Sequence, residues 1–277
     1  MRLGHLAIGR DNNFNLIRIA AALAVLVSHC FILPTGRSND DPLHALTGIT
    51  VGDLAVDVFF VISGFLISKS ALERNSCKFL SARALRIYPA LLVMLGITTL
   101  ALWAAFSQMD LWSFLTHRDS VAYFWRNSTL FPGVTFYLPG IFTENPIWRS
   151  VNGSLWTLTW EVRFYVIALA VAMLVKAIPA YSRAGKIASV FLLALALDLY
   201  FSPGGIRAPW VKLGVFFAGG MAMYYLREHI SLNRWIALLG VIAMAVAASM
   251  HVFLPVYMLA LPYVVLTCRV ISGPVES

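Results

Sequence analysis

Charged side chains are scarce in this sequence. They make up 12% of its 277 residues, whereas hydrophobic residues make up 60%; soluble proteins average about 25% charged and roughly 45–50% apolar residues. A water-soluble fold of this length cannot hide so much apolar surface, so we expect a lipid bilayer to be the solvent for most of the chain. Only three cysteines are present, which excludes a disulfide scaffold, and the absence of a short repeat excludes a fibrous protein.

Acidic residues are also few, and they leave a formal net charge of +8. A positive charge is typical of proteins that bind nucleic acid, but basic cytoplasmic loops of a membrane protein give the same total. Apolar runs near 20 residues long predict an all-α fold, a polytopic bundle of transmembrane helices with about eight spans. The spans are expected at residues 16–33, 54–72, 87–106, 155–175, 187–201, 210–226, 235–250 and 252–271.

Alternating the direction of these spans divides the 21 lysine and arginine residues into 14 on one side and 7 on the other. Because cytoplasmic loops are enriched in basic residues, we predict that both termini are cytoplasmic and that the protein is integral to a cell membrane, such as a bacterial inner membrane. The basic residues are spread over every inner loop instead of gathering on one face, which argues against a nucleic-acid partner. The N-terminal apolar run is predicted to be an uncleaved first span.

One long segment outside the spans, residues 107–154, is predicted on the outer side. It is rich in aromatic residues but interrupted by prolines, so neither a free loop nor a clean span is expected. We predict a partly structured segment that lies on or dips into the membrane surface and could cover a site. Glycosylation sequons begin at Asn127 and Asn152, but so short a pattern is most often accidental.

Ionisable residues inside spans are costly and are therefore candidates for function. Arg18 and His29 both lie in the first span, and their spacing of eleven positions places them on one helix face, about 16 Å apart along the axis. Histidine can accept a proton near neutral pH, so His29 is a candidate general base. The alternative is that His29 caps a neighbour at the outer interface and that Arg18 anchors the inner end of the helix.

Two acidic residues lie inside spans as well. Asp57 is one turn into the second span, ahead of Ser63 and Gly64, and Gly64 would let a helix or a ligand approach the backbone closely. For Asp57 we favour a structural role, in which it bonds backbone amides or pairs with an arginine. Glu161 in the fourth span is expected at a depth comparable to that of His29, where it could orient the imidazole; alternatively it pairs with Arg163.

Arg83 and Arg86 lie near the inner end of the third span and share a helix face. Pro89 fits an early turn of that helix, so free backbone amides would add positive potential beside the two guanidinium groups. Such a pair suits a ligand with phosphate groups. By position alone, the likelier interpretation is a basic anchor that contacts anionic lipid.

These groups, in this order, resemble the acyltransferase-3 family of integral-membrane acyltransferases, densely over residues 12–175 and beyond that by hydropathy only. The motifs that carry the resemblance are Arg18-x10-His29, Val56-Asp57-Val-Phe-Phe-Val-Ile-Ser63-Gly64-Phe, Arg83-x-x-Arg86-Ile-Tyr88-Pro89 and Ser154-Leu-Trp156-Thr-Leu-x-x-Glu161-x-x-x-Tyr165. Asn15 stands where the first motif often has an acidic residue. We predict one membrane domain over residues 1–277, which is short at its C-terminus for this family.

The resemblance implies an enzyme that transfers an acyl group, usually acetyl, from cytoplasmic acyl-coenzyme A to a hydroxyl of a carbohydrate, such as a surface polysaccharide or a lipid-linked sugar. It implies functional roles for His29, Arg18, Arg83 and Arg86, with the arginine pair on the coenzyme phosphates. No metal is predicted, and the sequence does not indicate an oligomeric state.

The predicted mechanism uses His29 as general base, Glu161 or Asp57 to steady the imidazolium and Arg18 to neutralise negative charge. Ser63, Gly64 and Tyr165 are expected to support this site. A covalent acyl-histidine intermediate is an open variant. The competing hypothesis is a transporter or flippase for a lipid-linked sugar, in which His29 and Glu161 relay protons.

Overall fold

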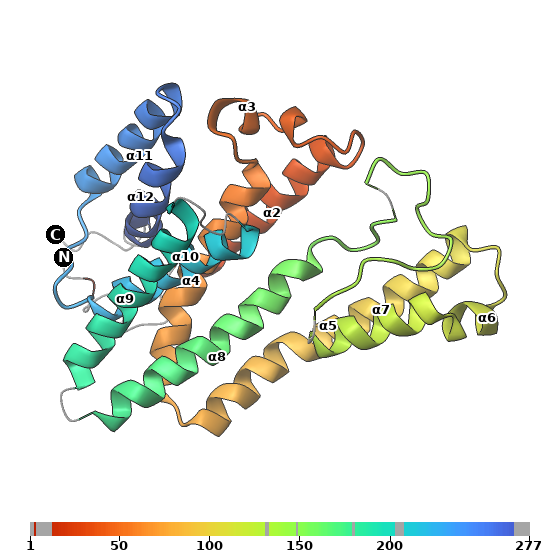
Figure 1. The fold of residues 1–277 in the computed structure, drawn as a ribbon, viewed down its shortest axis with the longest axis horizontal. Coiled ribbons are helices and arrows are strands. Elements are labelled where there is room, and N and C mark those ends of the chain that lie inside the picture. Colours follow the sequence, from red (N-terminus) through yellow and green to blue (C-terminus); the bar gives the residue numbers. More distant parts are fainter. Residues whose placement is uncertain are drawn as a thin grey trace. The chain divides into compact units, whose positions relative to one another are not determined.

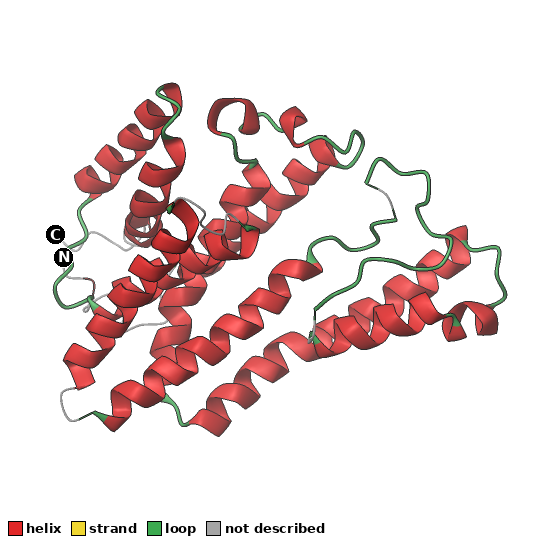
Figure 2. Ribbon diagram, in the orientation of Figure 1, coloured by secondary structure: helices red, strands yellow, loops and turns green. Residues whose placement is uncertain are grey.

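The computed structural model describes residues 3, 13–130, 133–147, 149–178, 181–202 and 208–268, and the regular structure in these ranges is helical (Figures 1 and 2). Among the described residues, five helices are long and apolar enough to cross a membrane. They are α2 (Phe14–Ile32), α4 (Val51–Glu73), α5 (Ser76–Phe106), α8 (Leu155–Ala177) and α9 (Tyr181–Phe201).

The other three predicted spans are also helices. They correspond to α10 (Pro209–Tyr225), α11 (Arg234–Ser249) and α12 (Phe253–Cys268), which are shorter than the first five. The end of the eighth predicted span, residues 269–271, lies outside the described residues. The prediction of an all-α bundle with about eight apolar helices is therefore confirmed.

Helix α5 begins eleven positions before the predicted third span. Asn75 caps it, because its side chain accepts a hydrogen bond from the backbone amide of Lys78 at 2.8 Å. Pro89 consequently lies in the helix interior, and the prediction that it marks an early turn was wrong. The backbone amides around Arg83 and Arg86 belong to the helix, so they add no free donors for a phosphate group.

The chain forms two compact units. Unit 1 comprises the described residues within 1–32, 37–73 and 167–277, and unit 2 comprises those within 33–36 and 74–166. In unit 1, helix α10 is almost entirely buried and packs along α4. The helices around this central pair are α2 on α4, α9 on α10, and α12 against both.

Glycine residues allow α4 and α10 to approach backbone to backbone. A Cβ atom added at Gly64 would lie 2.0 Å from the carbonyl oxygen of Phe217, and one added at Gly220 would lie 2.1 Å from that of Val61. Neither distance is sterically possible, because both neighbours are main-chain atoms within packed helices. The close approach expected at Gly64 is therefore a helix–helix crossing.

We expect the Gly220→Ala variant to lose about 3 kcal/mol of stability or more, the upper end of the range for overpacked sites, since the helix backbones must move apart. The measurement is the thermal unfolding midpoint after detergent extraction. Gly96→Ala in α5 is the matched control: nothing lies within 4 Å of a Cβ added there, so helix propensity should leave it neutral or slightly stabilised. Equal midpoints for the two variants would contradict the crossing.

The outer surface of α2 is apolar. Leu16, Ile19, Leu23 and Leu26 are each between 57% and 64% exposed, although leucine and isoleucine are among the residues most often buried in soluble proteins. A continuous apolar helix face of this kind is stable against lipid chains and not against water. The exposed face therefore agrees with the composition in identifying a membrane protein.

Unit 2 contains most of the predicted outer segment. Two short helices, α6 (Leu111–Thr116) and α7 (Arg118–Thr129), come first, and α7 packs on α5. The described residues that follow up to α8 are irregular. Asn127 ties them to α7, because its side-chain amide donates to the carbonyl oxygen of Thr135 at 2.8 Å and accepts from its backbone amide at 3.0 Å. Asn127 is fully buried, so its sequon cannot carry a glycan.

Candidate functional site

His29 and Arg18 lie on helix α2 in unit 1. Both side chains are half-buried, and His29 is one turn before the end of the helix at Ile32. The helix is continuous between them, so they share one face as expected. Helix α2 packs against α4. The contacts of Ser28, the residue before His29, fix the position of this end of α2.

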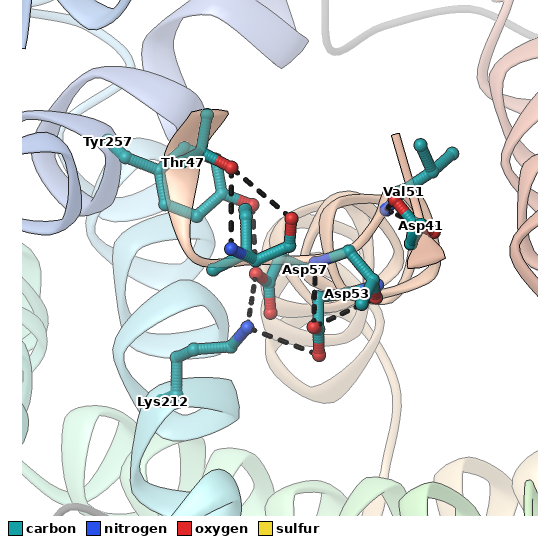
Figure 3. A network of polar contacts seen from close by, with 9 residues as sticks. Asp41, Thr47, Val51, Asp53, Asp57, Lys212 and Tyr257 are labelled. Atoms are coloured by element: carbon teal, nitrogen blue, oxygen red, sulfur yellow. Dashed lines mark hydrogen bonds and ion pairs between the residues drawn. The ribbon is translucent and has the colours of Figure 1, made fainter. Parts of the chain in front are cut away.

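Ser28 is anchored by a buried carboxylate. Its hydroxyl donates to Oδ2 of Asp41 at 2.5 Å, and both side chains are fully buried. Asp41 also accepts the backbone amide of Val51, the first residue of α4, at 3.0 and 3.1 Å (Figure 3). A Cβ added at Gly52 would lie 3.0 Å from the Ser28 hydroxyl. The residue before His29 is thus fixed tightly against the first turn of α4.

The protonation of Asp41 follows from these contacts. Burial acts to raise its pKa, but the hydrogen bonds from Ser28 and from the backbone amides of Val51 and Leu43 outweigh burial and hold the pKa below its ordinary value. A lowered pKa means that the folded state favours the carboxylate. Its contribution to stability is present above the ordinary pKa of an aspartate and is lost as the pH falls through the lowered pKa.

The start of α4 carries a reciprocal cap. The backbone amide and hydroxyl of Thr50 donate to Oδ2 of Asp53 at 3.0 and 2.9 Å, and the Asp53 amide donates to the Thr50 hydroxyl at 3.0 Å. This is a capping box, which satisfies amides that the helix leaves unpaired. Oδ1 of Asp53 lies 3.6 Å from Nζ of Lys212, so the cap continues into a cluster of charged groups.

Asp57 is at the centre of that cluster and is fully buried. Its Oδ2 lies 3.0 Å from Nζ of Lys212 and accepts a hydrogen bond of 2.8 Å from the hydroxyl of Tyr257 (Figure 3). The cluster therefore joins α4, α10 and α12. The cationic partner of Asp57 is a lysine and not the arginine considered from the sequence, and its structural role stays a prediction. Oδ1 of Asp57 is buried and accepts no hydrogen bond from the described residues, so it can accept one further donor.

Sequence reasoning identified neither Lys212 nor Tyr257. The charge count placed Lys212 on the outer side only as one of seven basic residues, whereas the structure places it in α10, where its side chain is 11% exposed. A signal was present, since Lys212 follows the start of the predicted sixth span by two positions and an ionisable residue inside a span needs a partner. Ser63 and Gly64 lie further along α4, both buried, and Gly64 is at the crossing with α10.

In unit 2, three of the predicted site residues meet between α5 and α8. The guanidinium carbon of Arg83 lies 5.8 Å from the centre of the Tyr165 ring and 5.9 Å from that of Phe79, distances typical of cation–π contacts. The hydroxyl of Tyr165 donates a hydrogen bond to Oε1 of Glu161. Tyr165 thus connects the arginine to the carboxylate, and this orients both groups.

Two other arginines considered for the site, Arg86 and Arg163, also lie in unit 2. Arg86 is exposed one turn beyond Arg83, so a ligand can reach its guanidinium group. Arg163, the alternative partner considered for Glu161, lies over the ring of Trp160 at 4.4 Å. The pairing of Glu161 with His29 stays a prediction, because His29 belongs to unit 1 and Glu161 to unit 2. Within the described residues, no group of three His, Cys, Asp or Glu side chains is arranged to hold a metal ion.

The chain is similar to known proteins over most of its length. A family model described as an acyltransferase domain matches residues 11–271. The chain is 33% identical over 257 residues to a protein of Shigella phage Sf6 named O-acetyl transferase, covering 87% of this chain and 70% of that protein. It is 29% identical over 265 residues to Nodulation protein 10 of Rhizobium leguminosarum bv. viciae, covering 83% and 68%. No solved structure matches the chain significantly.

Proposed function

The chain belongs to the acyltransferase-3 family of membrane acyltransferases, and on that premise we propose that it transfers an acetyl group from acetyl-coenzyme A to a hydroxyl of a carbohydrate. The acceptor class is a surface polysaccharide or a lipid-linked sugar. The observation that carries the proposal is the pair of arginines on α5, with Arg83 oriented by Tyr165 and Glu161 and with Arg86 exposed beside it. A preformed pair of guanidinium groups suits the phosphates of a coenzyme A donor.

The reaction needs a base near the acceptor hydroxyl, and we assign that role to His29. An imidazole nitrogen of His29 takes the hydroxyl proton while the oxygen attacks the thioester carbonyl carbon. The new C–O bond forms, the C–S bond breaks, and the departing thiolate takes the proton back from the imidazolium. Arg18, about 16 Å from His29 along the axis of α2, neutralises negative charge on the donor, and Glu161 or Oδ1 of Asp57 steadies the imidazolium. A covalent acetyl-histidine is the variant of this route with two transfers.

The predicted topology assigns the two substrates to opposite sides. The arginine pair lies near the start of α5, on the predicted cytoplasmic side where acetyl-coenzyme A is made available. His29 lies near the far end of α2, toward the predicted outer side. We propose that the protein lies in an inner membrane with both termini in the cytoplasm, and that it passes the acetyl group from the inner to the outer side.

The test uses the full chain in native membrane vesicles with acetyl-coenzyme A labelled in the acetyl group. Vesicles are incubated with the O-deacetylated surface polysaccharide of the same cells, with and without an uncoupler. We expect alkali-labile label in the carbohydrate and no dependence on the proton gradient. A transporter or flippase would leave the carbohydrate unlabelled and would respond to the uncoupler, and that outcome would overturn the proposal.

Replacing Arg83 and Arg86 with methionine is expected to raise the KM for acetyl-coenzyme A by about tenfold for each arginine, since a charge-assisted hydrogen bond contributes about 1.5–3 kcal/mol. The kcat at saturating donor should change much less, because uniform binding is lost and not transition-state stabilisation. Lys78→Met is the matched control, an exposed basic residue near the same end of α5. Equal KM values in the arginine variants and the control would exclude the pair from donor binding.

A further inference from the structure

A pocket of about 500 Å³ opens at the end of unit 1 where α2 ends and α4 begins. Its walls come from α3 (His44–Thr47), from the last residues of α9, and from the turn between α11 and α12. Asp41 binds the hydroxyl of Ser28, the residue before His29. The carbonyl oxygen of Asp41 also accepts the backbone amide of His44, the first residue of α3, at 3.0 Å. The pocket and His29 therefore lie at the same end of unit 1.

The described lining of the pocket is uncharged and rich in rings. Among the described residues, its lining includes no lysine, arginine, aspartate or glutamate, so these residues offer nothing for the phosphates of a coenzyme. Tyr200 and Phe253 present aromatic rings, and His44 and His251 add imidazoles that can donate and accept hydrogen bonds. A volume of this size is within the range of small-molecule sites. Apolar ring faces together with neutral donors and acceptors suit an uncharged, polyhydroxylated ring, which is the chemistry of a sugar.

His251 occupies a backbone conformation that glycine adopts with less strain. Its backbone has φ of 57°, in the left-handed region, at the second residue after the end of α11 at Ser249. The amide of Val252 donates to the carbonyl oxygen of Ala247 at 3.0 Å, as at helix ends that usually carry glycine. For a residue with a Cβ atom, this conformation is less favourable by about 1–2 kcal/mol. The His251 side chain is exposed on the pocket wall, so packing does not explain its presence.

The pocket wall is joined to the buried charge cluster. Phe253 stacks on Tyr257, with ring centres 5.0 Å apart and planes inclined by 18°, and Tyr257 donates to Asp57. Tyr200 is close enough to Lys212 to interact with it electrostatically. The ring of Phe253 is thus supported by the buried Tyr257, as expected for a site that binds a ligand without large rearrangement.

We infer that this pocket binds the sugar of the acceptor and presents its hydroxyl to the site at His29, an inference that rests on the proposed function. His44 and His251 donate and accept hydrogen bonds with the sugar hydroxyls, and Tyr200 and Phe253 provide the ring faces. The histidine at position 251 is retained in a strained conformation because its imidazole contacts the acceptor.

His251→Gly distinguishes a role in binding from a role in stability. Loss of a stabilising residue would lower the unfolding midpoint, whereas loss of a binding residue would raise the acceptor KM. The replacement relieves the backbone strain, so the thermal unfolding midpoint should stay equal or rise. The KM for the O-deacetylated polysaccharide should rise about tenfold, which corresponds to loss of one hydrogen-bonded contact. The kcat at saturating acceptor and the KM for acetyl-coenzyme A should not change. His44→Ala should show the same selective rise in acceptor KM.

His229→Gly is the matched control, an exposed histidine in the same unit that lies outside the pocket, in the turn after α10. It should leave both KM values unchanged. If the wild-type chain transfers acetyl groups but His251→Gly and His44→Ala keep the wild-type acceptor KM, the inference is overturned and the proposed function stands. A rise in the KM for acetyl-coenzyme A alone would also overturn it. If the wild-type chain labels no carbohydrate, the proposed function itself has failed.

Discussion

Replacing His29 with alanine is expected to lower acetyl transfer to the carbohydrate by at least about 100-fold, the lower part of the range for a positioned general base. The loss should appear in kcat, because the imidazole acts on the hydroxyl proton in the transition state and not in donor binding. The protein should stay in the membrane with an unchanged unfolding midpoint, since the His29 side chain is only half-buried while the neighbouring contacts of Ser28 are retained.

Three measurements make this expectation specific. Initial rates at saturating acetyl-coenzyme A give the kcat, and added imidazole should restore part of it in the His29→Ala variant. His117→Ala serves as control, because His117 accepts a backbone amide at the start of α7 and has no assigned role in transfer. Activity of His29→Ala within a factor of about three of the wild type would exclude His29 as the general base, because loss of a general base lowers the rate by at least about 100-fold.

The same variant distinguishes direct transfer from a covalent relay. If an acetyl-histidine forms, labelled donor alone should leave label on the acid-quenched wild-type protein and none on His29→Ala. If transfer is direct, neither protein retains label without acceptor. Both outcomes agree with a role for His29, and they decide whether the acetyl group crosses to the acceptor in one step or two.

The helices could be predicted from the sequence because lipid imposes a simple rule: a spanning segment must be long, apolar and internally hydrogen-bonded. Each of the eight apolar runs coincides with a helix over the part that the structure describes. The rule fails where a helix leaves the apolar layer, which is why the polar residues from Ser76 to Arg86 were not included in the third span although they are helical. Hydropathy reports the solvent around a helix and not the limits of the helix itself.

The partners within the site could not be predicted, because they depend on how each helix is rotated against its neighbours. Asp57 and Tyr257 are 200 positions apart in the sequence, and no spacing rule relates them. Arg83 and Tyr165 likewise meet only because α5 and the first part of α8 lie together in unit 2. What sequence reasoning provided was the requirement that each buried ionisable group has a partner, and applied to Lys212 it would have pointed to an acid.

Lys212→Met is expected to destabilise the protein by about 3–5 kcal/mol, because it leaves the carboxylate of Asp57 buried without its counter-ion. Asp57→Asn alone should cost less, since the amide oxygen still accepts the hydroxyl of Tyr257. Combining the two substitutions should recover a large part of the loss from Lys212→Met, because a neutral pair of similar volume avoids the uncompensated charge.

The double-mutant cycle is measured by thermal unfolding in detergent, with Lys78→Met as a control for loss of an exposed lysine. A coupling of more than about 1 kcal/mol shows that the two residues act as one pair, whereas additive effects would contradict the ion pair of 3.0 Å. The cycle also bears on transfer, because Tyr257 connects this pair to the pocket wall through Phe253. If the cluster fixes that wall, the acceptor KM should rise in Lys212→Met and return toward the wild-type value in the variant with both substitutions, since the amide at position 57 still accepts the hydroxyl of Tyr257.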